Sequence, residues 1–362
     1  MTTLLSDVRL RPLTVPASLD APDAADFTAM VAVRNRVFEQ ISGHTDHTFT
    51  AAELLPHFQD TEDEERFMWL VEADGALVGR VGVDLPRERG SRTAYWLIEL
   101  LREAWGRGIG SYAYELVERT AREHGRTVLQ AWAEQSPAPG DETLEPRTGF
   151  GRVPRDHITR FFLRHGHTLE QVERASALDL TAPMDRIEQL YSEATAAAKD
   201  YRVVQWQAPT PPELREGYAW MKSRMSTDVP AGDLEFDEEK WDAARVERHD
   251  SRYLEGGRTL QVTAAQHIAT GELCAFNELV IGQDPAGVSH QEDTLVLKEH
   301  RGHRLGMLVK CAGLLSWREL APQSPRVMTY NAEENRPMLD INEAIGFQPI
   351  AYEGAWKKTL QD

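Results

Sequence analysis

The 362-residue sequence contains only two cysteines and no apolar run long enough to span a bilayer. Cys274 and Cys311 lie in apolar stretches without a partner at metal-ligand spacing, which predicts buried, reduced thiols and no metal site. The N-terminal residues Met1 to Pro16 lack a basic segment followed by an apolar core, so no signal peptide is predicted. Together these absences predict a cytoplasmic chain with no membrane partner.

Basic residues are scarce relative to acidic ones, and 40 Lys and Arg against 58 Asp and Glu give a formal net charge of −18. Because binding to a nucleic-acid backbone depends largely on Lys and Arg, we expect no nucleic-acid partner. The acidity either attracts a cationic small substrate or serves only solubility. The length favours two domains, and the sequence does not distinguish a monomer from a homodimer.

The most informative stretch that is present runs from Thr294 to Met307. It combines a short apolar strand, a loop of basic residues and glycine, and a helix start. The first N–H groups of such a helix have no intrahelical acceptor, and the helix dipole is positive at this end. With the side chains of Arg301 and Arg304, this arrangement predicts an anion site best suited to phosphate.

A related loop, Trp105 to Ser111, precedes another predicted helix in the first half of the chain. Its glycines Gly106, Gly108 and Gly110 let the backbone approach a ligand closely, although a plain tight turn is the alternative interpretation. The glycines follow a fourth strand after a meander, which disfavours a dinucleotide-binding fold. The absence of a G-K-[ST] ending excludes a P-loop.

The two halves share one order of predicted elements: strand, two helices, three strands, loop with helix, strand, helix. This repetition indicates an internal duplication, with a domain at 1–182, a linker helix at 183–200 and a second domain at 201–362. The predicted strands are 8–15, 67–71, 77–83, 95–101, 127–132 and 168–180, then 201–206, 259–264, 274–281, 294–297 and 327–330. The predicted helices include 24–41, 51–58, 156–165, 212–225 and 237–253.

The last predicted helix begins after Asn335 and ends before Gly346, residues that suit an N-cap and the position just past a helix end. Asn342 is a polar residue within the apolar face of this helix. It either forms a hydrogen bond with a neighbouring backbone group or faces a bound ligand.

These motifs resemble the GNAT superfamily of acyl-CoA-dependent N-acyltransferases, twice over, in a layout similar to tandem members such as the mycothiol synthases. The family signature is Arg/Gln-x-x-Gly-x-Gly/Ala after the fourth strand, with an Asn near the end of the fifth strand and a Gly-Phe pair after a helix. The second half matches at Arg301, Gly306, Asn331, Asn335 and Gly346-Phe347. The resemblance implies an α/β (α+β) fold of two GNAT-like domains, each with a mostly antiparallel sheet flanked by helices.

Both halves depart from the family pattern. In the second half, Arg304 stands where glycine is usual, and Asn342 stands where many members carry a tyrosine that protonates the leaving thiolate. In the first half Trp105 replaces the Arg/Gln, Phe162 stands at the tyrosine position and His167 replaces the Phe of Gly-Phe. We therefore expect a degenerate first half, which still binds coenzyme A or braces the other half, and a catalytic second half.

The resemblance implies acetyl-CoA as cofactor and a small-molecule amine as substrate. Transfer to an amine needs a base, and Glu278 is the first candidate because burial in an apolar strand raises the pKa of a carboxylate; the alternatives are an outward-facing Glu278 or a base at His290, Glu292 or Asp293. Asp228, Asp233 and Glu235 are candidates for holding the substrate ammonium.

The predicted cofactor-binding residues are Leu295, Val296, Leu297, Arg301, Gly302, His303, Arg304, Leu305, Gly306, Met307, Asn331 and Asn335, with Gly106, Arg107, Gly108, Gly110 and Ser111 in the first half.

Three functions remain open from the sequence. The first is an acetyl-CoA-dependent N-acetyltransferase that uses Glu278 and Asn342 and a backbone N–H near Val296 or Leu297 that stabilises the thioester oxygen. The second is an aminoacyl or peptidyl transferase that uses charged tRNA, against which the acidic balance counts. The third is a non-catalytic acyl-CoA-binding protein.

Overall fold

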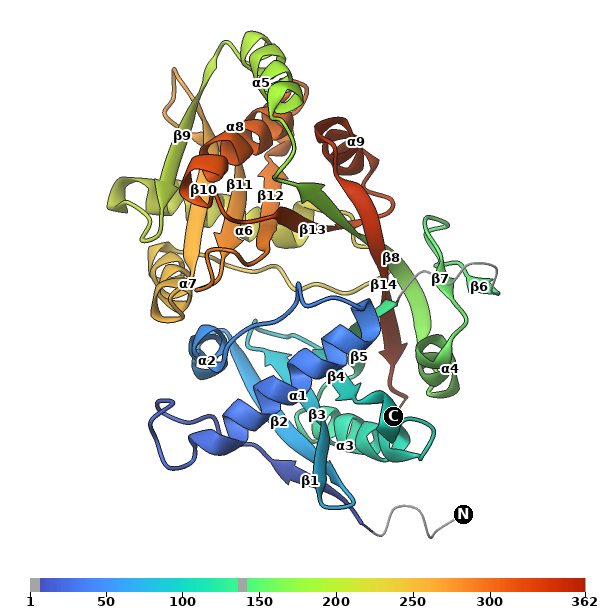
Figure 1. Cartoon of the computed structure of the whole chain (residues 1–362). Coiled ribbons are helices and arrows are strands. Elements are labelled where there is room, and N and C mark those ends of the chain that lie inside the picture. The colour runs from blue at the N-terminus through green and yellow to red at the C-terminus, as the bar shows by residue number, and fades with distance from the viewer. Residues whose placement is uncertain (1–6, 136–141, 362) are drawn as a thin grey trace. The chain divides into compact units, whose positions relative to one another are not determined.

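The computed structural model describes residues 7–135 and 142–361, which form two compact units (Figure 1). Unit 1 comprises Met1–Val172, Gly232–Glu235 and Ala351–Asp362, and unit 2 comprises Glu173–Ala231 and Phe236–Ile350. The predicted ranges 1–182 and 201–362 follow chain order, whereas the compact units do not. The segment predicted as a linker helix lies within unit 2, and the C-terminal segment lies within unit 1.

Unit 1 contains a sheet in the order β1-β2-β3-β4-β5-β14, in which only the β4–β5 pair is parallel. The strands are β1 (Val8–Pro12), β2 (Glu64–Ala73), β3 (Ala76–Pro86), β4 (Thr93–Leu100), β5 (Val128–Gln135) and part of β14 (Gln348–Thr359). The helices are α1 (Ala24–Ser42), α2 (Ala51–Gln59), the short 3₁₀ helix η1 (Arg102–Ala104), α3 (Ile109–Glu123) and α4 (His157–Arg164). A separate two-stranded pair consists of β6 (Thr143–Leu144) and β7 (Val153–Pro154).

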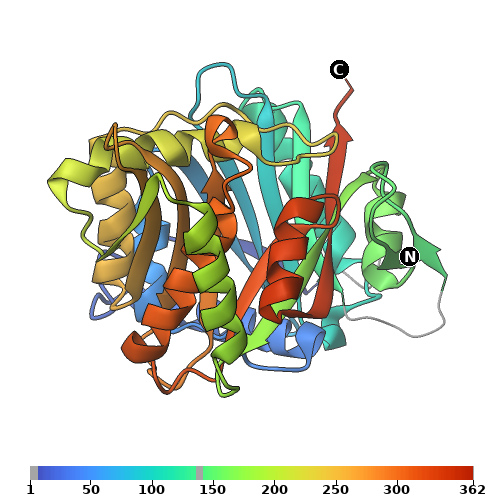
Figure 2. The ribbon, with the colours of Figure 1, turned by 90° about the horizontal axis from the view of Figure 1, so that it is seen from above.

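Unit 2 repeats this plan in the order β8-β13-β12-β11-β10-β9, with β12 and β13 parallel. The strands are part of β8 (Thr168–Asp179), then β9 (Tyr201–Gln207), β10 (Thr259–His267), β11 (Leu273–Ile281), β12 (Ser289–Val296) and β13 (Arg326–Ala332). The helices are α5 (Asp185–Ala197), α6 (Pro212–Asp228), α7 (Ala243–Glu255), η2 (Lys298–His300), α8 (Leu305–Leu320) and α9 (Arg336–Ile345). Helix α5 packs against α8 (Figures 1 and 2).

The halves of the chain exchange their last strands. Strand β14 comes from the C-terminus, yet its residues Tyr352–Thr359 pair with β5 of unit 1, and Figure 2 shows it running beside that strand. Conversely, residues 173–179 of β8 pair with β13 of unit 2. Trp356 of β14 is fully buried and stacks on Phe162 at 4.6 Å, so the exchanged strand contributes to the unit 1 core. The sequence analysis predicted no strand at β14.

The parallel strands of each unit pair only at their beginnings. Residues 93–95 of β4 pair with residues 128–130 of β5, and residues 289–290 of β12 pair with residues 327–328 of β13. Beyond these residues the pairing stops, while both strands continue toward a loop at the start of a helix, α3 or α8. Each unit therefore presents unpaired strand edges beside a helix N-terminus, which is where backbone groups can meet a ligand.

Most predicted elements are present, several boundaries shift by up to three residues, and the two largest shifts have local causes. Helix α7 begins at Ala243 rather than 237, because Asp242 is its N-cap and accepts a hydrogen bond from the Arg245 N–H at 2.8 Å. Strand β12 begins at Ser289 rather than 294, since a β-bulge interrupts its alternation. Both cysteines are buried free thiols, as predicted. No helix in the described part of the chain is long and apolar enough to cross a membrane.

Burial of His167 predicts acid sensitivity of unit 1. Its Nε2 lies 2.9 Å from the Tyr114 hydroxyl, the ring contacts Trp96 and Phe162, and burial lowers the His167 pKa to about 3. The unfolded chain therefore binds a proton at this histidine first as the pH falls below about 6.5, and the free energy of unfolding should decrease from there toward pH 4. His167→Phe should reduce this decrease, measured by urea unfolding at several pH values. An unchanged pH dependence would contradict the assignment.

Candidate functional site

The two glycine-containing loops share one backbone conformation. Each follows a 3₁₀ helix, η1 or η2, and the loop residues correspond at a constant offset of 196 residues (301 minus 105). Gly106 and Gly302 have φ values of 71° and 89°. Gly108 and Arg304 are the N-caps of α3 and α8 and are both left-handed, with φ values of 84° and 57°. The structure thus places Arg304 in a conformation that favours glycine, which fits its place in the family pattern.

Both loops lead to helix starts that can receive an anion. The first helical hydrogen bonds run from Tyr112 N to Gly108 O at 3.1 Å and from Leu308 N to Arg304 O at 3.0 Å. The N–H groups of the three residues before Tyr112, and of those before Leu308, precede these bonds and have no acceptor within their helix. The helix dipole adds partial positive charge at the same place. Both loops therefore suit a phosphate.

The two arginine side chains predicted to add positive charge to the anion site of unit 2 contact other protein groups. Arg301 donates from Nε to the Val296 carbonyl at 3.3 Å, and Arg304 pairs with Glu193 of α5 at 3.4 Å. In unit 1, Trp105 takes the place of Arg301, because its Nε1 donates to the Leu100 carbonyl at 2.8 Å. The substitution of Trp for the family's Arg/Gln thus preserves the contact that ties the loop to the strand end.

A backbone N–H at the end of the fourth strand is available for a ligand in each unit. The Leu101 N–H bonds to Val78 O at 2.9 Å, and the Leu297 N–H bonds to Cys274 O at 2.9 Å. Alternate residues of an antiparallel strand point their N–H groups to opposite sides. The preceding residues Leu100 and Val296 therefore point theirs toward the diverging parallel strand. Of the two donors predicted, Val296 fits the role and Leu297 is already engaged.

A cavity of about 230 Å³ lies beside the loop of unit 1. It is lined by the ends of β4 and β5, by the loop residues Gly106 and Gly108, by Gly110 and Ser111 in the first turn of α3, and by α1 and α4. The cavity is also lined by Trp105 and by Leu100, whose backbone N–H points toward β5. Trp105 stacks on His157 of α4 at 4.5 Å, which closes one wall. The half that we expected to be degenerate therefore holds a cavity at the predicted cofactor loop.

Three carboxylates also line this cavity. Glu134, the next-to-last residue of β5, is buried and lies 3.3 Å from Nε2 of the equally buried His47, which follows α1. Glu353 of β14 faces the same cavity and is the register partner of Glu134. Glu99 also lines the cavity, but Arg80 holds it through two hydrogen bonds of 2.6 and 2.8 Å. The cavity thus combines backbone groups that suit a phosphate with a wall that contains carboxylates.

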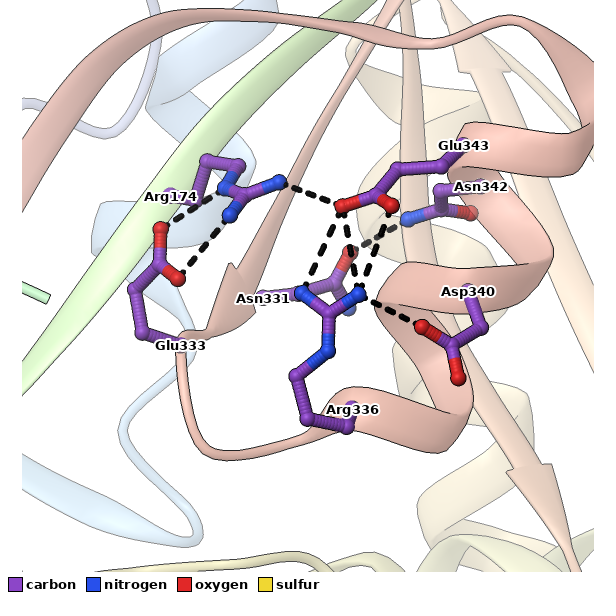
Figure 3. A network of polar contacts seen from close by, with 7 residues as sticks. All are labelled: Arg174, Asn331, Glu333, Arg336, Asp340, Asn342 and Glu343. Carbon is purple, nitrogen blue, oxygen red and sulfur yellow. Dashed lines mark hydrogen bonds and ion pairs between the residues drawn. The ribbon is translucent and has the colours of Figure 1, made fainter. Parts of the chain in front are cut away.

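Asn342 in unit 2 has protein partners on both sides of its amide. Its Oδ1 accepts a hydrogen bond from Lys310 Nζ at 2.7 Å. Its Nδ2 donates to Asn331 Oδ1 at 2.6 Å (Figure 3). Lys310 is fully buried on α8, and burial lowers its pKa to about 7. This chain of three side chains connects α8, α9 and the end of β13, where the family pattern places ligand contacts. The structure thus gives Asn342 two side-chain partners, whereas the sequence left a backbone partner and a bound ligand as alternatives.

An ion network strengthens the same corner of unit 2. Arg174 of β8 binds Glu333 at 2.7 and 2.9 Å and Glu343 at 2.8 Å, and Arg336 binds Asp340 at 2.5 Å and Glu343 at 3.3 Å (Figure 3). Arg174 and Glu333 are mostly buried, so their bidentate pair is less screened than a surface pair. The network fixes α9 against the end of β13.

Glu278 is buried within a charged cluster of unit 2. It lies on β11 opposite the bulge at Glu292 and Asp293, accepts a hydrogen bond from the Tyr218 hydroxyl and lies 3.1 Å from Lys222 Nζ. Lys222 Nζ also lies 2.6 Å from Asp293. Burial raises the Glu278 pKa to about 7, although Lys222 opposes this shift. Glu278 thus has the expected burial and raised pKa, and the alternative of an outward-facing Glu278 is wrong. Its carboxylate is paired with the buried Lys222 ammonium.

The other acidic candidates also have cationic partners. Asp228 pairs with Arg224 at 2.6 Å and Lys298 at 3.1 Å. Glu292 lies 3.9 Å from Arg258. Asp233 and Glu235 belong to the segment 232–235 of unit 1, where they pair with Arg147 at 3.2 Å and Arg92 at 2.6 Å. His290 lies in the paired part of β12, in register with Met328.

The remaining predicted cofactor residues lie along the loops and helix starts. Gly306, in the first turn of α8, packs against α9, because a Cβ there would meet Ile341 Cδ1 at 2.9 Å. Arg107 pairs with Asp74 at 2.7 Å, and Ser111 Oγ lies 3.0 Å from His165 Nε2. Asn335 is the N-cap of α9 without a side-chain cap bond. Gly302 and His303 are exposed, whereas Leu295, Leu297, Leu305 and Met307 are buried.

Sequence reasoning missed His47, Glu134 and Glu353. The predicted fifth strand ended at 132, two residues before Glu134, and nothing in the local pattern connects that residue with His47 or with the C-terminal strand. The one available signal was the alternation at Ala131, Ala133 and Gln135, which would have extended the predicted fifth strand beyond residue 132 to include Glu134.

Comparison with known proteins agrees with this geometry. Residues 32–139, which include β4, the unit 1 loop, α3 and β5, match the acetyltransferase (GNAT) family model. Over 98% of this chain and 99% of its own, a tandem GNAT protein from the clavulanic acid biosynthesis pathway has the same fold, with a TM-score of 0.73 and 22% identity. The chain has a tandem GNAT fold. The family match supports acyl transfer as its general chemistry.

Two further solved structures are more distant. A GCN5-related N-acetyltransferase from Sphaerobacter thermophilus is 16% identical, with a TM-score of 0.59 over 98% of this chain and 96% of its own. The glucosamine N-acetyltransferase region of a fungal multi-domain GH3 β-N-acetylglucosaminidase is 12% identical, with a TM-score of 0.58 over 97% of this chain and 38% of that one. No curated protein sequence matches the chain. At these identities the likeness shows the fold alone.

Proposed function

We propose that this tandem GNAT protein is an acetyl-CoA-dependent N-acetyltransferase that acts on a small amine in the cavity of unit 1. The observation that carries the proposal is the cavity itself, which joins a phosphate-suited helix start to an acidic wall. The family match at residues 32–139 covers the same half. This assignment moves the expected catalysis from the second half to the first.

The residues of unit 1 fit the donor. The first-turn N–H groups of α3 and the left-handed Gly106 and Gly108 suit a pyrophosphate, because no side chain obstructs the backbone there. The space between the diverging β4 and β5 suits an extended chain that leads from the pyrophosphate into the cavity. Acetyl-CoA would supply the activated acetyl thioester, and the Leu100 N–H would hold the thioester oxygen.

The acidic wall fits an amine. An alkyl ammonium has a pKa of about 10, so it must lose a proton before its nitrogen can form a bond. Glu134, held by His47, would accept that proton directly or through water, and Glu353 would add negative charge that attracts the ammonium. The C–N bond forms as the C–S bond breaks, and the thiolate, whose pKa is about 8.5, can leave without a dedicated acid. Phe162 at the family's tyrosine position is compatible with this chemistry.

A matched pair of variants tests which loop binds the donor. Gly108→Asp and Arg304→Asp place a carboxylate at equivalent left-handed N-caps, and a Cβ at Gly108 meets no atom within 4 Å. Gly108→Asp should weaken acetyl-CoA binding by about tenfold or more, because the carboxylate repels the pyrophosphate, whereas Arg304→Asp should change it little. Calorimetric titration measures both. Weakening by Arg304→Asp alone would place the donor in unit 2 instead.

Turnover distinguishes the proposal from its alternatives. Coenzyme A release from acetyl-CoA should depend on one or more members of a panel of small amines, and Gly108→Asp should reduce it. If the chain binds acetyl-CoA and no amine supports coenzyme A release, the result supports a non-catalytic acyl-CoA-binding protein. If charged tRNA, but no free amine, supports transfer, the result supports an aminoacyl transferase. The net charge of −18 argues against that outcome.

A further inference from the structure

We propose that Glu272, Cys274 and His300 of unit 2 bind one zinc ion. A carboxylate oxygen of Glu272, Sγ of Cys274 and a ring nitrogen of His300 all lie within 4.8 Å of one another. Nε2 of His300 is 3.7 Å from Oε2 of Glu272. Tetrahedral zinc holds such ligands at about 2.0–2.3 Å, which places ligand atoms about 3.5 Å apart, so small side-chain movements complete the site.

A second contact orients the histidine for this role. Nδ1 of His300 lies 2.9 Å from the hydroxyl of Tyr201, on the opposite side of the ring from the nitrogen that faces Glu272. A hydrogen bond from one ring nitrogen fixes the tautomer and directs the other nitrogen to a metal, and such contacts are usual for histidine ligands. This arrangement distinguishes the cluster from a chance grouping of surface carboxylates.

The types of ligand select the metal. A thiolate, an imidazole and a carboxylate together suit zinc, whereas magnesium and calcium prefer oxygen ligands alone. Binding replaces the thiol proton of Cys274 by the metal and releases that proton to solvent. The fourth ligand is either water or His267. The ring of His267 packs on Tyr201, with 5.3 Å between ring centroids. Because its Nδ1 lies 2.9 Å from Thr270 Oγ1, Nε2 is the ring nitrogen left to bind the metal.

The position of the cluster suggests what the metal stabilises. Glu272 immediately precedes β11, Cys274 is the second residue of that strand, and His300 ends η2 immediately before the left-handed loop of unit 2. The Cys274 carbonyl already accepts the Leu297 N–H. A zinc ion would add a second connection and hold the loop in its observed conformation. The sequence does not reveal the site, because its ligands come from two segments without a metal-binding spacing.

Cobalt substitution tests the site directly. The full, reduced chain, stripped of metal and titrated with Co²⁺, should show a sulfur-to-cobalt charge-transfer band that saturates at one ion per chain. Cys274→Ser should abolish the band, and Cys311→Ser, which alters the buried thiol of α8, should keep it. Glu272→Gln, at an exposed position that tolerates the change, should weaken zinc binding at least tenfold in competition with a chromophoric chelator.

Thermal unfolding gives an independent readout. Zinc should raise the Tm of the parent chain and of Cys311→Ser but not that of Cys274→Ser. His267→Gln should lower zinc affinity if the ring is the fourth ligand and leave it unchanged if water is. Absence of the charge-transfer band in the parent chain, or its persistence in Cys274→Ser, would overturn the proposal.

Discussion

The Glu134→Gln variant should release coenzyme A from acetyl-CoA with a kcat about 10²- to 10⁴-fold below that of the parent chain. Glutamine keeps the size of the side chain but cannot accept a proton from the substrate ammonium. The side chain of Glu134 is 5% exposed and His47 lies 3.3 Å away, so the geometry of the cavity should survive the change. Acetyl-CoA binding should therefore be nearly unaffected, and the loss should fall on kcat rather than on donor affinity.

Two matched variants make this result specific. Glu353→Gln removes one negative charge from the same cavity and keeps Glu134 and His47 in the chain, so its loss should be smaller and expressed mainly in KM for the amine. Glu278→Gln changes the base predicted from the sequence and should leave kcat within a few-fold at temperatures where the chain is folded. A large loss in Glu278→Gln, with an unchanged rate in Glu134→Gln, would return the chemistry to unit 2.

The Lys222→Met variant should lose about 3–5 kcal/mol of unfolding free energy in unit 2, because it leaves the buried Glu278 carboxylate without its cation. Lys222 is 6% exposed, binds Glu278 and Asp293, and lies over the Trp241 ring at 5.0 Å. Burial lowers its pKa, but Asp293 and then Glu278 outweigh burial, so the pKa is raised and the ammonium stays charged at neutral pH. Urea unfolding measures the loss.

Adding Glu278→Gln to Lys222→Met should recover part of this loss, because the double variant no longer buries an unpaired carboxylate at that position. Arg36→Met, which breaks an exposed ion pair with Glu103, should lower the free energy of unfolding far less than Lys222→Met does, because solvent screens the exposed pair. A cost for Lys222→Met similar to that of Arg36→Met would show that the buried cluster does not stabilise unit 2.

Local patterns in the sequence predict the loops and most elements of this fold. The strand, glycine loop and helix around Gly108 and Arg304 depend on short-range periodicity and on backbone conformations that glycine favours, and the structure has them at matched positions. The repeated order likewise predicts two similar sheets. These features require no knowledge of which distant segments meet.

The exchange of final strands could not be predicted, because pairing partners are not encoded locally. Strand β14 carries Glu353, Lys357 and Lys358 among its apolar residues, which obscures the alternation of a buried strand. The same limit applies to the cavity, since Glu134 and His47 come from different elements and Glu353 arrives from the opposite end of the chain. Family motifs directed attention to the second half, where Asn342 proves to be bonded to Lys310 and Asn331.

A crystal structure of the chain with acetyl-CoA tests the central claim most directly. We predict the pyrophosphate at the N-terminus of α3, beside Gly106 and Gly108, with the thioester between β4 and β5 near the Leu100 N–H and Glu134. Acetyl-CoA bound only at the loop of unit 2, beside Arg301 and Gly306, would contradict the assignment of the donor site to unit 1.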